Sequence, residues 1–151
     1  MGPRRKGRIL ALQALYAYEI QGKISLDKLL QFSWHEAEGE EEGEEGEEEV
    51  KAKQFASLLV TGTVENLSQI DKLIQGHLEN WELKRVAKVD LSIIRMSVYC
   101  LLYQKDIPPS VVIDEAVTLS KKFGTDDSYR FVNGVLDGIR KSLQGKESSE
   151  A

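Results

Sequence analysis

The 151-residue sequence has one cysteine, three prolines and only short apolar runs, and each shortage narrows the choice of fold and function. A lone cysteine, Cys100, excludes an internal disulfide and a CxxC metal or redox motif, which is typical of a reducing compartment. Apolar runs such as residues 111–113 are far shorter than the roughly 20 residues of a membrane span. We therefore expect a cytoplasmic protein without a membrane segment.

Motifs of catalysis and of cofactor binding are also missing. The sequence contains no GxSxG, no Walker-type phosphate loop and no GxGxxG. His35 and His77 lie in separate segments without a partner at metal-ligand spacing. The carboxylate pairs at residues 114–115 and 126–127 stand where helices are expected to begin, so the helix dipole accounts for them. We predict neither an enzyme nor a protein that holds a cofactor or a metal.

The net charge of −5 hides a strong asymmetry along the chain. Residues 36–49 read EAEGEEEGEEGEEE, with ten glutamates and no basic residue. The rest of the chain has 20 basic and 15 acidic residues and therefore a net charge of +5. Because the glutamate segment has little apolar surface to bury, we expect a disordered, solvated loop over residues 36–49. The body of the protein is basic.

Apolar residues recur at three- and four-residue steps between the prolines and glycines, which predicts an all-α fold. The predicted helices cover residues 5–21, 26–34, 50–78 with a bend at Gly62, 90–103, 109–123 and 127–143. Residues 90–103 are apolar on two sides, which indicates a central helix. We predict one compact domain of about seven helices over residues 1–143, the acidic loop inserted after the second helix, and a flexible polar tail over residues 144–151.

The N-terminus carries four cations within five residues, at Arg4, Arg5, Lys6 and Arg8. They stand at the start of a helix, where the helix dipole disfavours positive charge, so local stability does not explain them. A solubilising or targeting tail is one interpretation, and a phosphate-contacting arm is the other. Further along the same helix, Gln13 offers hydrogen bonds and Tyr16 offers a ring on which a base could stack. This pattern favours binding of single-stranded RNA.

Residues 89–139 contain the blocks VIDEA and FVNGVLD, and residues 4–22 read RRKGRILALQALYAYEIQG. In order and spacing these stretches, about half of the chain, resemble the bacterial NusB family of transcription antitermination factors. The glutamate-rich segment departs from the family pattern, because it falls where the family has an ordinary connection. The resemblance implies two packed helical bundles and no enzymatic activity.

The resemblance also implies a function. Members bind the boxA element of ribosomal RNA leader transcripts as single-stranded RNA, together with the ribosomal protein NusE, and join other Nus factors on RNA polymerase. Carried over to this sequence, the RNA-binding positions are Arg4, Arg5, Lys6, Arg8 and Tyr16, which join Gln13 from the residue pattern. Asp127 matches an acidic position near the RNA edge of the complex, where its like charge would weaken RNA binding. The NusE-binding positions are Asp90 and Phe131.

Two alternatives remain open from the residues alone. The chain could be a helical protein–protein adaptor without direct RNA binding, in which the basic arm is incidental. The basic helix could also self-associate into a homodimer and cover its own RNA surface. For the glutamate segment, a solvated spacer competes with a loop that folds over the basic arm and competes with RNA.

Overall fold

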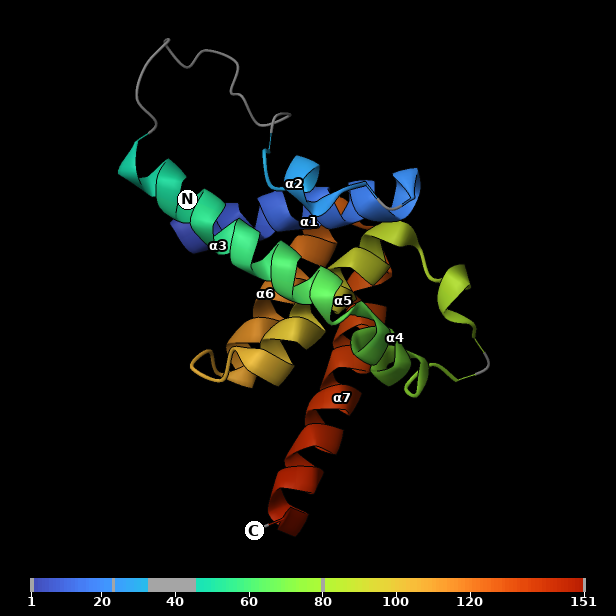
Figure 1. Cartoon of the computed structure of the whole chain (residues 1–151). Coiled ribbons are helices and arrows are strands. Elements are labelled where there is room, and N and C mark those ends of the chain that lie inside the picture. The colour runs from blue at the N-terminus through green and yellow to red at the C-terminus, as the bar shows by residue number, and fades with distance from the viewer. Residues whose placement is uncertain (1, 23, 33–45, 80, 151) are drawn as a thin grey trace. The chain divides into compact units, whose positions relative to one another are not determined.

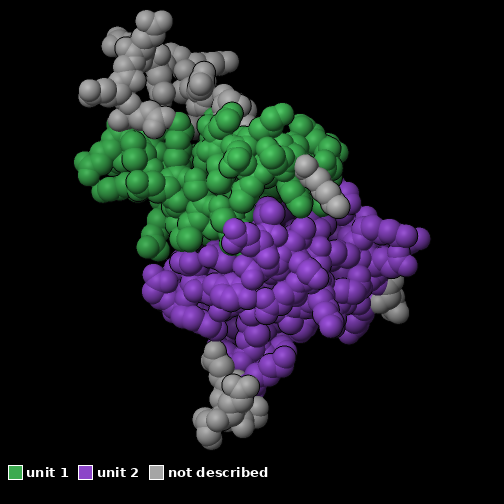
Figure 2. All heavy atoms as spheres, viewed as in Figure 1, with its two compact units in different colours: residues 1–62 green, residues 63–151 purple. Residues whose placement is uncertain are grey.

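The computed structural model describes residues 2–22, 24–32, 46–79 and 81–150. Within these ranges the chain forms helices and no strand, which confirms the all-α prediction (Figure 1). The helices are α1 (Pro3–Gln21), α2 (Leu26–Leu29), α3 (Glu47–Glu65), α4 (Leu67–Gln75), α5 (Lys88–Tyr103), α6 (Pro109–Phe123) and α7 (Ser128–Glu150), with a short 3-10 helix, η2 (Leu83–Arg85). Figure 2 shows two compact helical units, residues 1–62 and residues 63–151.

Helix α1 follows the sequence prediction closely. Pro3 occupies its first turn, and Gly22 ends it with a φ of 67°, a left-handed value that suits glycine. Gly7 faces α3 so closely that an added Cβ would lie 2.8 Å from the Ala52 carbonyl oxygen and 2.9 Å from Cδ2 of Phe55. The absence of a side chain at position 7 therefore lets the first turns of α1 pack directly on α3.

Helix α2 is shorter than predicted. Its cap is as expected, because the Ser25 hydroxyl accepts a hydrogen bond from the Lys28 amide at 3.4 Å. The helix ends at Leu29 because the chain turns to bury Phe32, which is 1% exposed and adopts a φ of 48°. The prediction of a helix to residue 34 is wrong at this end, and residues 33–34 lie outside the described residues.

The predicted acidic loop over residues 36–49 is wrong at its C-terminal end. Residues 36–45 lie outside the described ranges, but Glu47–Glu49 form the first turn of α3. Glutamate is a good helix former, and a helix N-terminus stabilises negative charge. The Lys51 amine lies 3.4 Å from Glu47 Oε1, one turn away, and adds a weak exposed ion pair. The glutamates therefore start a helix where apolar periodicity is absent.

The predicted helix over residues 50–78 is interrupted, but not at Gly62. Gly62 is buried inside α3, and the interruption comes at Asn66, whose φ of −113° and ψ of 18° are not helical. The Asn66 carbonyl oxygen then accepts a hydrogen bond from the Ile70 amide at 3.0 Å, so it begins α4. Asparagine favours helix ends because its side chain competes for backbone hydrogen bonds.

In the second unit, α5 is the central helix, as its two apolar sides predict. All twelve residues from Asp90 to Leu101 are buried, and α5 packs against α4, α6 and α7. Cys100 is a buried free thiol, as expected. Arg95 joins α5 to α4 through a paired interaction with Asp71, with nitrogen–oxygen distances of 2.8 and 2.9 Å. This buried pair fixes the register of the two helices.

Helices α6 and α7 form the rest of the second unit. Helix α6 has the predicted bounds, and at the start of α7 the Thr125 amide donates a hydrogen bond to Ser128 Oγ at 2.9 Å. The prediction that the last helix ends at residue 143 is wrong, since α7 continues to Glu150. Lysine, glutamine and glutamate are good helix formers, so a polar sequence does not by itself end a helix. Nowhere in the described ranges is a helix long and apolar enough to cross a membrane.

Candidate functional site

Three cations on the first turns of α1 form the basic surface, which we define as Arg4, Arg5 and Lys6. Arg4 and Arg5 are exposed, whereas Lys6 is half-buried with its amine 3.8 Å from Glu49 Oε2 on α3. The first turn of α1 contains no acidic residue, and its N-cap, Gly2, supplies no side-chain hydrogen bond. Positive side chains therefore add to the positive end of the helix dipole, which makes this surface attractive to anions.

Arg8 differs from the other three predicted cations. It is only 8% exposed, and its guanidinium carbon lies 5.3 Å from the centre of the Phe55 ring on α3. The guanidinium carbon of Arg4 lies 5.4 Å from the same ring. Both distances are within the range of cation–π contacts. The structure therefore separates an arginine that packs against α3 from the exposed cations beside it.

Gln13 and Tyr16 lie further along α1 and are both exposed, Tyr16 by 40%. Residues three apart lie on the same side of a helix, so the amide and the ring neighbour each other. Eleven residues separate Arg5 from Tyr16, which is roughly 16 Å along the helix axis. The structure thus places a positively charged end and an exposed aromatic ring on one helix, at a separation suited to a short strand rather than a single nucleotide.

A groove of about 490 Å³ lies between the connection after α4 and the first turns of α7, and we name it the Phe131 groove. The rings of Trp81 and Phe131 lie in it with their centres 6.1 Å apart, a favourable distance for aromatic packing. Trp81 is 52% exposed and Phe131 is half-buried. An added Cβ at Gly134 would meet no atom within 4 Å, so the α7 wall of the groove is open there.

His77 is one of the residues that line the Phe131 groove. Its Nδ1 lies 3.1 Å from the Leu73 carbonyl oxygen, and an added Cβ at Gly138 would lie 3.2 Å from its Cδ2. The ring therefore packs on α7 where a glycine leaves room for it. Within the described part of the chain, no three histidine, cysteine or carboxylate side chains gather as a metal site would require. The groove is an apolar recess with polar edges, suited to a protein side chain or a short apolar segment.

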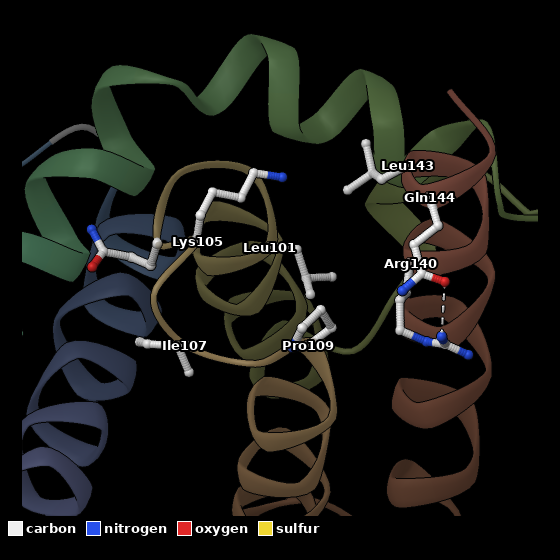
Figure 3. Close-up of a pocket in the computed structure, with 8 residues that line it drawn as sticks. Leu101, Lys105, Ile107, Pro109, Arg140, Leu143 and Gln144 are labelled. Carbon is white, nitrogen blue, oxygen red and sulfur yellow. Dashed lines mark hydrogen bonds between the residues drawn. The ribbon is translucent and has the colours of Figure 1, made fainter. Parts of the chain in front are cut away.

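A second cavity, of about 300 Å³, lies between the end of α5, the connection to α6 and the later turns of α7 (Figure 3). Leu101, Ile107 and Leu143 give it apolar walls, and Lys105 and Arg140 bring cations to it. The Arg140 guanidinium is already engaged, since it donates to Gln144 Oε1 at 3.1 Å and to Asp137 Oδ1 at 2.6 Å. None of the residues predicted from the sequence lines this cavity.

The two predicted acidic positions lie in different surroundings. Asp127 is exposed directly before α7, and its carbonyl oxygen accepts a hydrogen bond from the Phe131 amide at 3.4 Å. Asp90 lies in the first turn of α5, is 7% exposed and has no hydrogen-bond partner for Oδ1. The structure therefore brings Asp127 and Phe131 together at the start of α7 and places the Asp90 side chain in the interior.

Trp81 and Gly134 are among the residues of the groove to which the sequence analysis assigned no binding role. Trp81 lies in an irregular connection, where hydrophobic periodicity cannot tell whether a side chain is buried or exposed. Gly134 lies inside a predicted helix, where the sequence alone gives no reason for a glycine. Two signals could have found them. A tryptophan in a polar connection and a glycine one turn after a half-exposed phenylalanine both indicate a surface built for contact.

The comparisons with known proteins agree on one family. The model of the NusB family matches residues 5–141. A curated relative, the transcription antitermination protein NusB of Treponema denticola, is 51% identical over 137 residues, which are 91% of this chain and 95% of the relative. The solved structure of T. maritima NusB covers 100% of both chains with a TM-score of 0.79 and 38% identity. A second solved structure, of the antitermination factors NusB and NusE in complex with dsRNA, covers 93% of this chain and 97% of the other with a TM-score of 0.77 and 26% identity.

Proposed function

This chain belongs to the NusB family of transcription antitermination proteins, and from that membership we propose that its basic surface binds RNA while the Phe131 groove receives NusE. The family is non-enzymatic, and its members act with the transcription machinery in the cytoplasm. The RNA that we propose is single-stranded boxA RNA of ribosomal RNA leader transcripts. The complex formed with RNA and NusE then joins other Nus factors on RNA polymerase.

The observation that carries the RNA proposal is the position of Arg4, Arg5 and Lys6. Cations at a helix N-terminus are unfavourable by themselves, so a bound polyanion is the natural source of compensation. Gln13 and Tyr16 extend the surface with groups that read and stack bases, as single-stranded RNA recognition requires. Arg8 belongs to the same site through the Phe55 ring rather than through an exposed side chain.

The solved structure with NusE and dsRNA supports both partners, since it shows that a similar protein binds RNA and NusE together. Its RNA is double-stranded, whereas the stacking ring of Tyr16 favours unpaired bases. The comparison of the two RNA forms is therefore part of the test. Tighter binding of double-stranded than of single-stranded RNA would mean that the basic surface contacts only the phosphate backbone and does not stack on bases.

For the protein partner, Phe131 is the proposed anchor because a half-buried ring in an apolar groove is the kind of residue that dominates interfaces. We propose a different part for Asp90. Its carboxylate lies in the interior with an unpaired oxygen, so it acts on partner binding through the shape and charge of the α5 N-terminus. Asp127 is exposed directly before α7, where its negative charge would repel RNA phosphates and weaken RNA binding.

The direct experiment measures binding of the full chain to a labelled boxA oligonucleotide with and without NusE. We expect NusE to raise the RNA affinity and RNA to raise the NusE affinity by the same factor, because binding free energies are reciprocally coupled. No enhancement by NusE would overturn the cooperative mechanism. The matched control replaces Arg4, Arg5, Lys6 and Arg8 by alanine, and unchanged assembly of the three components would favour a pure protein adaptor.

Self-association is measured in the same samples. Light scattering at several protein concentrations, with and without RNA, follows the molecular mass. If a homodimer covers the basic surface, RNA and dimer compete, and boxA RNA lowers the mass toward that of one chain with one RNA. A mass that does not change with RNA would separate the dimer from the RNA surface.

A further inference from the structure

We propose that Phe55 of α3 is a positioning residue for RNA binding, whose ring orders the side chains of Arg4 and Arg8 before RNA arrives. The inference rests on the proposed RNA binding by α1 and adds to it a residue from another helix. Nothing in the pattern of α1 alone points to this residue, since it lies about 50 positions away in the sequence.

The geometry places one ring against two arginines. The guanidinium carbons of Arg4 and Arg8 lie 5.4 and 5.3 Å from the centre of the Phe55 ring. The two arginines are four residues apart and so lie on the same side of α1. Gly7 lies between them in the sequence, and an added Cβ there would lie only 2.9 Å from Phe55 Cδ2. The glycine therefore lets the ring reach the surface of α1 between the two side chains.

The ring does more than fill the core of the first unit. Phe55 is itself half-buried, while its neighbours Ala52, Ala56 and Leu59 on α3 are fully buried and supply the core contacts of that helix. A half-buried phenylalanine with two guanidinium groups against it lies at the edge between core and basic surface. Its position is that of a support for the charged side chains.

Ordering an arginine before binding raises affinity. A long side chain loses rotamer freedom when it holds a phosphate, and a ring that has already restricted it removes part of that loss. The guanidinium plane can rest on the ring while its N–H donors remain directed at a phosphate. Arg8, which is largely buried, supports the ring, and Arg4, which is exposed, presents its donors.

The test compares substitutions at Phe55 in the full chain, with fluorescein-labelled boxA RNA as the probe and fluorescence anisotropy as the measurement. Phe55→Leu keeps an apolar side chain and removes the ring, and we expect about 3- to 10-fold weaker RNA binding, because Arg4 and Arg8 lose the ring that restricts their side chains. Phe55→Tyr keeps the ring and is expected to bind within about twofold of the wild type. Leu58→Ala is the control, because Leu58 is exposed on the same helix and contacts neither arginine in this way.

A second measurement does not involve RNA. In the free protein, the side-chain protons of Arg4 and Arg8 should show ring-current shifts in the NMR spectrum, and these should vanish in Phe55→Leu and persist in Phe55→Tyr. Loss of the shifts with unchanged or tighter RNA binding would overturn the positioning role and leave the proposed function intact. Absence of RNA binding by the wild type would overturn both. If Phe55→Leu lowers the melting temperature, Phe55→Met serves as the second ring-free variant.

Discussion

Helices α1 and α7 both carry arginines and an aromatic residue at the surface, yet they differ in how their cations are paired with carboxylates. The first turn of α1 contains no acidic residue, and Arg4 and Arg5 are exposed. On α7, the Arg140 guanidinium lies 2.6 Å from one Asp137 oxygen and the Lys141 amine lies 3.2 Å from the other. Helix α7 therefore pairs these two cations within the helix and borders an apolar groove, whereas Lys6 of α1 pairs with Glu49 of α3 and lies beside two exposed arginines.

The difference separates the two proposed kinds of recognition. The proposed RNA binding through α1 would depend on phosphate charge and be weakened by salt, because RNA binding releases counterions. The proposed binding of NusE in the Phe131 groove would depend on apolar burial and on shape, which salt hardly changes. On this proposal, one chain holds an RNA and a protein through different forces.

The largest expected effect is that of Phe131→Asp. A carboxylate in the apolar groove loses hydration without gaining a partner, so we expect NusE affinity to fall by about 100-fold or more. The RNA affinity of the free chain should stay within about twofold, and the helical circular-dichroism signal should be unchanged. Isothermal titration with each ligand measures both. Loss of the helical signal would instead make Phe131 a core residue and end the comparison of the two surfaces.

Alanine at two glycines should shift stability in opposite directions. At Gly7, a Cβ would lie 2.8 Å from the Ala52 carbonyl oxygen, and backbone cannot move aside cheaply, so we expect the free energy of unfolding to fall by about 1–3 kcal/mol. At Gly134, an added Cβ would meet no atom within 4 Å, so the higher helix propensity of alanine should raise the free energy of unfolding by about 0.5–1 kcal/mol. Urea unfolding measures both, and shifts of the same sign would contradict the close approach of α1 and α3.

The salt dependence of RNA binding distinguishes the exposed cations from Arg8. Three phosphate contacts on a single strand give a slope of roughly −2 in a plot of log affinity against log salt, and four give roughly −3. Because Arg8 is buried against Phe55, we expect the smaller slope, and Arg5→Gln should reduce it by about 0.7. Arg8→Gln should weaken binding without changing the slope. An equal change in slope for both variants would place Arg8 at a phosphate.

The parts of the fold that the sequence predicts are those decided by local chemistry. Pro3 and Gly22 set the ends of α1, and two-sided apolar periodicity identifies α5 as the central helix. One error comes from a tertiary contact, because burial of Phe32 ends α2 and no local pattern shows this in advance. The errors at the start of α3 and at the end of α7 have a local cause, because apolar periodicity carries more weight in the prediction than the helix propensity of polar residues.

The candidate site divides in the same way. A run of cations predicts the basic surface, because charge at a helix N-terminus is visible in the sequence. The burial of Arg8 and of Asp90 depends on helices that arrive from elsewhere in the chain, and so does the meeting of Trp81 with Phe131. Residue type and spacing therefore predict which groups are present, and packing decides which of them face outward.

The smallest expected effect concerns Asp137, the carboxylate that pairs with two cations of α7. Hydrogen bonds from Arg140 and Lys141 hold the pKa of Asp137 below its ordinary value of 3.8. A lowered pKa in the folded state stabilises the protein above the unfolded pKa, and this contribution is lost as the pH falls through the folded pKa. The pair is largely open to solvent and is screened, so Asp137→Asn should lower stability slightly at pH 7 in low salt and by less at pH 3. Urea unfolding at the two pH values measures the difference.

The same variant tests whether Asp137, by pairing with Arg140 and Lys141, keeps these cations of α7 from binding RNA. If so, Asp137→Asn leaves Arg140 and Lys141 without their shared carboxylate, and nonspecific RNA binding should rise slightly at low salt. The log–log salt slope should then become steeper by at most about 0.7 for each phosphate that these cations reach. Lys51→Gln is the matched control, since it removes an exposed one-turn ion pair from α3 without touching α7. An unchanged slope would mean that the cations of α7 lie away from the RNA path, so that the position of the charge, and not its pairing, separates the two helices.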